Sequence, residues 1–276
     1  MKTPEPILVS QLFPPVLDSL LDLMSGLSDD DWNKPTACAR WSVKDIASHL
    51  LGGEVGILSR QRDGYKYSGD PFIAWEDLVV LINNLNDIWV RATSRISPRV
   101  LCELMKLTGE QVCDYFKSLD PYAMGNPVDW AGPEPAPVWL DLAREYTERW
   151  HHQQQIREAV GRPGLKQPHF FAPVLDAFVR ALPHTYSTVE AKDGTLVALT
   201  ITGDSGGQWF LLRENTEWSL YIEATRAADA EVVLDQDIAW RLFTKGIRKN
   251  EVLSKVTLVG DQALATRALD MVSVIA

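Results

Sequence analysis

The sequence predicts a helical bundle followed by a small α+β domain, and three observations lead to this fold class. Apolar residues recur at helical spacing through the first part of the chain. Short runs rich in β-branched and aromatic residues, separated by turn residues, fill the second part. Gly and Pro interrupt the helical pattern between Gly161 and Pro168. We therefore expect two domains, residues 1–165 and 166–276, and a mostly antiparallel sheet in the second.

The first domain has five segments whose apolar residues repeat at the spacing of one helix face. Ser42 precedes the second segment, and Asp45 three residues later gives the pattern of a capping box. Residues 120–137 contain five prolines and two glycines, which exclude a helix and predict a long crossover or a lid. The expected helices span about residues 14–27, 43–62, 75–96, 98–119 and 138–160.

The second domain alternates short apolar runs with turns. Gly-rich residues 203–207 and polar residues 213–217 read as turns between neighbouring strands. The expected strands are 195–202, 208–213, 218–223, 231–234 and 255–259, and the expected helices are 172–182, 237–245 and 261–274.

Composition and charge exclude several classes of protein. With 46% hydrophobic and 23% charged residues the chain has an ordinary globular composition. Its 27 basic and 37 acidic residues give a net charge of −10 without a dense basic run, so nucleic acid is not an expected partner. No apolar stretch is long enough to span a membrane, and residues 1–10 do not resemble a signal peptide. We expect a soluble, cytoplasmic protein.

The three cysteines point away from a structural role for sulfur. Cys38, Cys102 and Cys113 are odd in number and widely spaced, which favours neither a disulfide framework nor a cysteine-rich zinc site. No nucleophile motif of the Gly-x-Ser-x-Gly type occurs. Nucleophilic catalysis by a protein side chain therefore has little support.

A metal site is the most specific chemical prediction from the residues. Glu148 and His152 are four residues apart in a helical segment, so they share one helix face and could bind one ion. His49, in the second expected helix, is the best candidate for a third ligand. Three N/O ligands leave one coordination position open, which is typical of a site for chemistry. His151 is an alternative to His152, and Glu148 with His152 alone could be a surface pair.

Glu145 lies one turn before Glu148, on nearly the same face of the expected helix. It could orient a ligand imidazole through a hydrogen bond. The alternative is a solvated carboxylate without a role in the site.

Two segments carry a resemblance to a known family. Residues 41–50, Trp-Ser-Val-Lys-Asp-Ile-Ala-Ser-His-Leu, and the pattern Glu148-x-x-x-His152-x-x-Gln155-Ile156 ahead of Gly161 resemble the metal-binding helices of the DinB-like superfamily. Within it they are most similar to the mycothiol-dependent maleylpyruvate isomerase group. The resemblance implies a DinB-like four-helix bundle that binds a divalent metal through one early histidine and a late Glu-x-x-x-His pair. His49, Glu148 and His152 match these positions.

The second domain is similar to the sterol-carrier-protein-like domain that often follows this bundle. The similarity lies in residues 228–232, 242–243 and 256–264. The family is thought to contact its dicarboxylate substrate through an arginine of this domain, and Arg213, Arg226 and Arg241 are the candidates here. Each could instead be a surface arginine that keeps the protein soluble.

Together these features predict a metal-dependent enzyme. Two imidazoles and a carboxylate suit zinc first, and also nickel, iron(II) or manganese. The resemblance implies a low-molecular-weight thiol such as mycothiol as cofactor and a small-molecule substrate. The reaction would be cis–trans isomerisation of the maleylpyruvate type or thiol S-transfer. A metal-assisted hydrolase and a non-enzymatic small-molecule binding protein are the alternatives, and the sequence does not indicate an oligomeric state.

Overall fold

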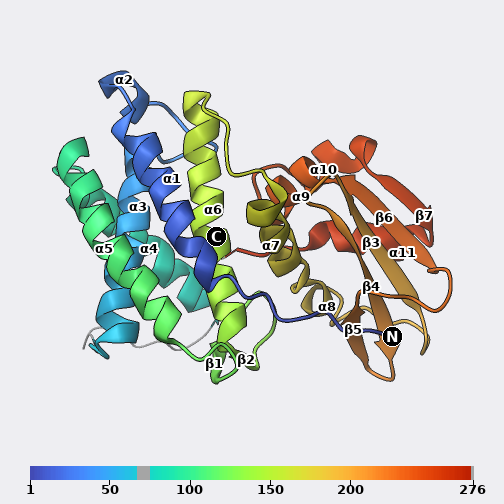
Figure 1. Ribbon diagram of the computed structural model, residues 1–276. Coiled ribbons are helices and arrows are strands. Elements are labelled where there is room, and N and C mark those ends of the chain that lie inside the picture. Colours follow the sequence, from blue (N-terminus) through green and yellow to red (C-terminus); the bar gives the residue numbers. More distant parts are fainter. Residues whose placement is uncertain (67–74, 275–276) are drawn as a thin grey trace. The chain divides into compact units, whose positions relative to one another are not determined.

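The computed structural model describes residues 1–66 and 75–274, which form two compact units (Figure 1). The helical unit comprises Ser10–Asp120 and Glu148–Leu165, and the sheet unit comprises Met1–Val9, Pro121–Thr147 and Lys166–Val274. The chain enters the sheet unit for the last time after Leu165, where the sequence predicts a domain boundary. The division into consecutive domains 1–165 and 166–276 stays a prediction.

The helical unit contains the helices that the apolar spacing predicts. Helix α6 begins and ends where the sequence places it, and its residues from Glu148 onward belong to this unit. The segment predicted as one helix over 43–62 is α-helical at first and ends in a π-helical segment. The elements are α1 (Phe13–Ser25), α2 (Asp29–Trp32), α3 (Val43–Gly56), the π-helical η2 (Ile57–Arg62), α4 (Trp75–Thr93), α5 (Pro98–Ser118) and α6 (Val138–Val160).

Helix α3 begins at a capping box, as Ser42 and Asp45 predict. The Ser42 hydroxyl accepts a hydrogen bond from the Asp45 backbone N–H, and the Asp45 carboxylate accepts one from the Ser42 backbone N–H. The box satisfies two N–H groups that a helix start otherwise leaves without partners. It fixes the first turn of α3, and His49 lies in the second turn.

The helical unit closes around an apolar core to which α1, α3, α5 and α6 all contribute. Burial of this surface is the main force that holds the helices together. The buried core residues are Leu20, Leu23, Met24, Trp32, Val43, Ile46, Ala47, Leu50, Leu51, Leu101, Met105 and Ile156.

The sheet unit is built on a five-stranded sheet with the order β5-β4-β3-β6-β7. Its neighbours run antiparallel except β3 and β6, which are parallel. In the central strand, Leu199 lies opposite Trp209 of β4 and Val232 of β6, and all three are buried. The strands are β3 (Leu196–Thr202), β4 (Gly207–Glu214), β5 (Glu217–Tyr221), β6 (Ala230–Asp235) and β7 (Thr257–Gly260).

Helices complete the sheet unit, and α9 and α11 pack against β3 and β6. Helix α7 starts earlier than the predicted residue 172, because Pro168 occupies its first position, where proline is well tolerated. The α-helices after residue 165 are α7 (Pro168–Val179), α8 (Leu182–Thr185), α9 (Gln236–Phe243), α10 (Lys249–Val252) and α11 (Gln262–Arg267).

Two further predictions differ from the structure. The helix expected over 261–274 ends at Arg267 and continues as a 3₁₀ turn, Ala268–Asp270, after which Met271 is extended. Burial of Ala268, Leu269 and Met271 in the core of the unit outweighs their helical spacing. The segment 120–137 contains no helix, as expected, but forms the antiparallel pair β1 (Met124–Pro127) and β2 (Pro135–Pro137).

The fold class is confirmed: a helical region is followed by a region with a mostly antiparallel sheet. Among the helices in the described ranges, none combines the length and the apolar composition needed to cross a membrane.

Candidate metal centre

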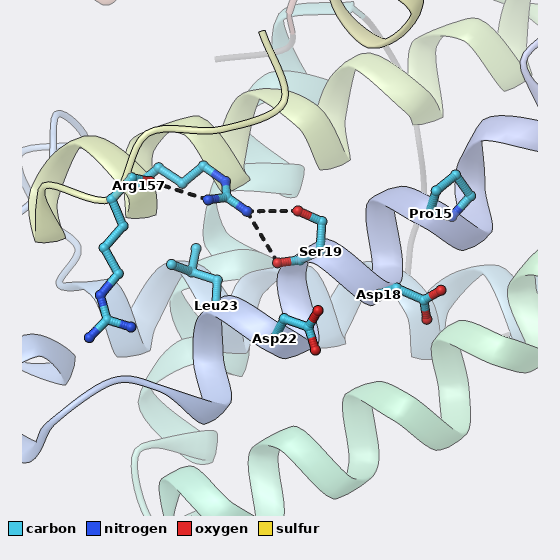
Figure 2. A pocket seen from close by; sticks show the side chains of 7 residues that line it. Pro15, Asp18, Ser19, Asp22, Leu23 and Arg157 are labelled. Carbon is cyan, nitrogen blue, oxygen red and sulfur yellow. Dashed lines mark hydrogen bonds between the residues drawn. The ribbon is translucent and has the colours of Figure 1, made fainter. Parts of the chain in front are cut away.

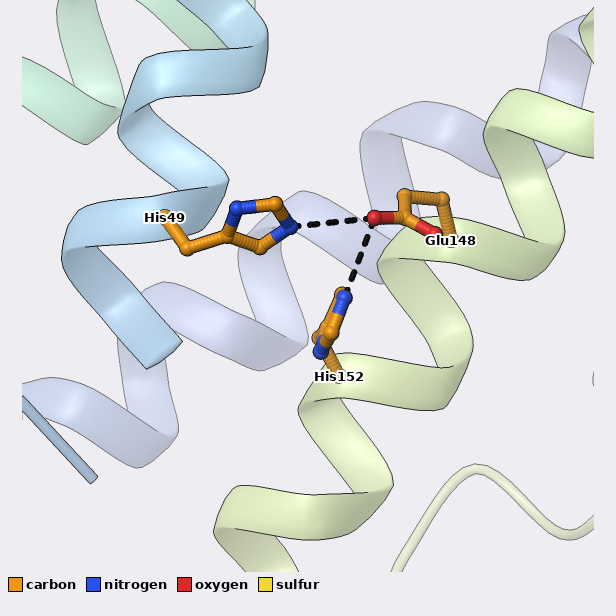
Figure 3. Close-up of side chains that lie close together, drawn as sticks. All are labelled: His49, Glu148 and His152. Carbon is orange, nitrogen blue, oxygen red and sulfur yellow. Dashed lines mark hydrogen bonds and ion pairs between the residues drawn. The ribbon is translucent and has the colours of Figure 1, made fainter. Parts of the chain in front are cut away.

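Helices α3 and α6 bring together the three residues that the sequence predicts as metal ligands (Figure 3). His49 extends from α3, and Glu148 and His152 extend from consecutive turns of α6. Oε1 of Glu148 lies 3.0 Å from Nε2 of His49 and 3.0 Å from Nε2 of His152. The two imidazole rings are 4.6 Å apart and meet nearly edge to face, at 72°. The Nε2 atoms of the two histidines therefore point at the same carboxylate oxygen.

The spacing of these atoms fits a single metal ion. The candidate ligand atoms all lie within 4.8 Å of one another. Nitrogen and oxygen ligands sit about 2.1 Å from zinc, so in a tetrahedral site they are about 3.4 Å apart. Small side-chain movements would place the three atoms at that spacing. The donor set of two imidazoles and one carboxylate leaves a fourth position open.

Burial and mutual attraction shift the pKa values of all three groups. Burial raises the pKa of Glu148, but the nearby imidazoles outweigh it and hold that pKa well below 4.5. Burial lowers the pKa of His49 below 6.5, and the hydrogen bond that His49 donates to Glu148 offsets this only in part. Burial also opposes the charged form of His152, yet attraction to Glu148 raises its pKa above 6.5. Near neutral pH the site thus holds an ionised carboxylate beside a neutral His49.

Gln155 connects His152 to His151 within α6. Its Oε1 lies 2.8 Å from Nδ1 of His152, and its Nε2 lies 3.1 Å from Nε2 of His151. An amide oxygen only accepts and an amide NH₂ only donates, so His152 carries a proton on Nδ1 and His151 presents an unprotonated Nε2. This contact directs Nε2 of His152 toward Glu148, where Nε2 donates a hydrogen bond to the carboxylate. The geometry therefore favours His152 over His151 as the ligand.

Aromatic and polar side chains surround the histidine pair. The ring of Trp41 lies 4.8 Å from that of His49 and 6.5 Å from that of His152. Asn86 of α4 forms a side-chain hydrogen bond with His49. Trp89 Nε1 donates to the backbone carbonyl of Ser48, at 2.7 Å. These contacts fix the His49 ring from α4 and from the segment before α3.

Glu145 and the three candidate arginines belong to the sheet unit. Glu145 is buried and accepts a hydrogen bond from Arg144, in contrast to the solvated carboxylate that was one expectation. Arg226 pairs with Asp229, and Arg241 stacks on Trp240. Arg213 lies over the Trp218 ring, with its Nε and Nη1 buried and without hydrogen-bond partners in the described part of the chain. None of these contacts connects an arginine with the three candidate ligands.

Sequence reasoning did not assign the side chains that orient the candidate ligands. Gln155 is three residues after His152 and four after His151. Residues at these spacings are neighbours on a helix surface, so the sequence alone places Gln155 within reach of both histidines. Asn86 and Trp41 carry no such signal, because their contacts depend on how separate segments pack. These residues extend the site beyond the predicted ligands.

Comparisons with known proteins relate both the sequence and the fold to one group. Residues 13–157, just over half of the chain, match the family described as mycothiol maleylpyruvate isomerase N-terminal domain. This region includes His49, Glu148 and His152. The matched region ends before residue 166, so the sterol-carrier-protein-like character of the second domain stays a prediction. None of the curated proteins matches the chain in sequence.

Solved structures extend the likeness to most of the chain. The chain is similar to the crystal structure of the mycothiol-dependent maleylpyruvate isomerase and to that of a histidine-to-alanine mutant of this enzyme. Each is 10% identical, with 90% of both chains covered and a TM-score of 0.54. At this identity the likeness concerns the fold alone.

Proposed function

The chain belongs to the mycothiol maleylpyruvate isomerase N-terminal domain family and is therefore an enzyme, and from this premise we propose a metal- and thiol-dependent isomerase. The proposed metal ligands are His49, Glu148 and His152. The proposed substrate is a small molecule with a conjugated cis double bond, of the maleylpyruvate type. The proposed thiol cofactor is mycothiol or a similar low-molecular-weight thiol.

One observation carries the proposal. Two imidazole nitrogens from different helices meet one carboxylate oxygen at 3.0 Å each, in the region that matches the family. A structural role would need a buried Glu–His pair but not a second histidine at the same oxygen. Zinc is the expected ion, because two imidazoles and one carboxylate form a donor set known from catalytic zinc sites. Nickel, iron(II) and manganese stay open, because no protein thiolate restricts the choice.

The bound groups would supply the chemistry that the side chains lack. A metal ion lets a thiol lose its proton near neutral pH, and the thiolate is the nucleophile whose reversible addition to a conjugated cis double bond permits rotation before the thiol leaves. Side chains of the protein would position the metal ligands and set their protonation states.

These side chains hold the ligands in the state that binding requires. Glu148 stays ionised because the imidazoles lower its pKa. The lowered pKa of His49 keeps this ring neutral and able to bind. Gln155 holds the proton of His152 on Nδ1, so Nε2 is free to become a ligand once it releases its own proton. Trp41 packs against the ring of His49 and lies near that of His152, which supports the orientation of both imidazoles.

The cysteines fit a reducing compartment, and we place the reaction in the cytoplasm. Cys38, Cys102 and Cys113 are all free. Burial raises the pKa of the Cys113 thiol to about 11, so this group does not compete as a thiolate.

The test combines metal content with thiol dependence. Metal is measured by mass spectrometry on protein purified without chelator, for the wild type, His49→Ala and His152→Ala. His184→Ala is the control, because His184 is an exposed histidine of the sheet unit. We expect one metal per chain in the wild type and control, and none in the two site variants, with all four folded by circular dichroism.

Activity is then measured on maleylpyruvate with and without mycothiol. Turnover that needs both metal and thiol supports the proposal. Conjugation of the thiol to an electrophile without isomerisation would indicate an S-transferase instead. Turnover that needs metal but no thiol would contradict the thiol step and favour hydrolysis, and a wild type that binds no zinc or nickel would contradict the metal site.

A further inference from the structure

A row of polar side chains on α6 contacts the neighbouring helices of the bundle. Arg149, Gln153 and Arg157 are spaced by four residues, so they follow one face of the helix. We call these three residues the polar stripe of α6. They alternate with Glu148 and His152 along the same turns. The stripe therefore lies next to the candidate ligands on the helix surface.

Each residue of the stripe makes its own contact with another helix. Nε and Nη2 of Arg149 each lie 3.1 Å from Oε1 of Glu54 on α3. Gln153 Nε2 donates to the backbone carbonyl of Val16 on α1, at 3.0 Å. Arg157 Nη2 donates to the carbonyl and the hydroxyl of Ser19 on α1, at 3.2 and 2.7 Å (Figure 2). Three residues along α6 thus form hydrogen bonds or an ion pair with α1 and α3.

The stripe is also connected along its own helix and packed against aromatic rings. Oε1 of Gln153 accepts from Nε and Nη2 of Arg157, at 3.1 and 2.9 Å. The guanidinium of Arg149 lies 5.3 Å from the ring centres of both Phe13 and Phe116. Gln153 is fully buried, and the side chain of Glu54 is only 5% exposed. The contacts of Arg149 and Gln153 are directional and shielded from water, and those of Arg157 are directional and partly buried, so each has one favourable geometry.

Such contacts contribute more to position than to stability. A buried ion pair is often no more stabilising than apolar residues of the same volume, because desolvation offsets the attraction. Apolar contacts between helices tolerate small shifts that directional hydrogen bonds do not. A helix rises 1.5 Å per residue, whereas metal–ligand distances vary by only about 0.2 Å. A small slide of α6 would separate Glu148 and His152 from His49.

We propose that the polar stripe sets the axial and rotational position of α6 against α1 and α3, and so holds Glu148 and His152 opposite His49. Arg149, Gln153 and Arg157 are positioning residues in this proposal, and Glu54 is the partner of the first. The inference rests on the metal site of the proposed function. The proposal gives a role to the buried charges of Glu54 and Arg149. Neither the apolar core nor metal coordination requires these charges.

The experiment replaces the ion pair with apolar side chains of similar size and separates metal affinity from stability. The variant is Glu54→Leu with Arg149→Met. The control makes the same two kinds of change in the exposed pair of α5, Glu110→Leu with Lys106→Met. Co(II) is the probe, since its visible absorption reports coordination geometry. Stability is measured by urea unfolding of protein treated with chelator.

We expect the Glu54/Arg149 variant to unfold at or above the urea midpoint of the wild type and to bind Co(II) about tenfold more weakly, with a changed spectrum. The control variant keeps the affinity and spectrum of the wild type. A second variant, Gln153→Met, removes the contacts to Val16 and Arg157 without removing a charge. We expect it to weaken Co(II) binding to a similar extent, which keeps the test decisive if the double variant does not fold.

The outcomes separate the two proposals. If the wild type binds Co(II) and a folded stripe variant binds it with the same affinity and spectrum, the positioning role is overturned while the metal site stands. If the wild type itself binds no Co(II), the proposed function fails and the positioning role fails with it.

Discussion

The helical unit and the sheet unit bury different kinds of side chains. Helix α6 buries an unbroken run of polar residues from His151 to Gln155. In the described residues 196–274 of the sheet unit, the buried polar side chains are only serine and threonine. Burying amide and imidazole groups costs free energy unless each finds a partner. Among the described side chains, the buried amides and imidazoles therefore lie on α6 alone, on the turns that carry two of the candidate ligands.

The apolar core of the sheet unit should show the largest loss of stability on substitution. Leu199 lies in the central strand of the sheet and is 1% exposed. Leu199→Ala should lower the free energy of unfolding by about 2–5 kcal/mol, because it removes buried methyl groups and leaves a cavity. Urea unfolding measures this loss. Metal content per folded chain should stay at the wild-type level, and its loss would show that the sheet core also shapes the site.

A substitution on α6 should give the opposite result. Gln155→Leu removes the acceptor at Nδ1 of His152 and should weaken zinc binding about 10- to 100-fold. Gln154→Leu is the matched control, because Gln154 is also buried but donates to the carbonyl of Gly164. Competition with a chromophoric chelator measures both affinities. Equal affinities in the two variants would contradict the orienting role of Gln155.

Acid should destabilise the polar helix through His151. Burial lowers the pKa of His151 to about 3 in the folded protein. Below pH 6.5 the unfolded chain therefore binds a proton at His151 that the folded protein does not bind. Stability of the metal-free protein should therefore fall as the pH drops from 6.5 toward 3. His151→Phe has no imidazole to protonate at this position and should lose less stability between pH 7 and pH 5. Urea midpoints at the two pH values measure the difference, and equal losses would argue against a neutral buried His151.

Two helix caps, one in each unit, should show the smallest loss of stability on substitution. Ser42 caps α3 in the helical unit, and Asp261 caps α11 in the sheet unit. Replacing either with Ala should cost about 1 kcal/mol in unfolding free energy. Only Ser42→Ala should also weaken metal binding, because α3 carries His49. Thermal unfolding and chelator competition on both variants test this, and equal effects on metal would remove the link between the cap and the site.

The sequence predicted best the elements with clear ends. Helix α6 matches its predicted range, because Pro137 and Gly161 bound it on both sides. The short helix α2 was not predicted, although Ser28 and Asp31 form a capping box at its start. The final helix was predicted too long, since tertiary burial of residues 268–271 decides its end.

The candidate ligands were visible in the sequence, and their surroundings were not. Glu148 and His152 share a helix, so their spacing alone places them together. The approach of His49 to them follows from the resemblance and from the packing of α3 on α6. The pairing of Glu54 with Arg149 joins separate helices and has no local pattern in the sequence.

The hydrogen bond between His49 and Glu148 joins residues 99 positions apart in the chain. An ion that needs both side chains cannot be captured by a nascent or unfolded chain, in which only Glu148 and His152 are neighbours. Loading would then follow folding, and the order of events in the cell would be translation, closure of the bundle and metal uptake. Because such an ion binds only the folded state, it would shift the folding equilibrium and protect the finished protein from proteolysis.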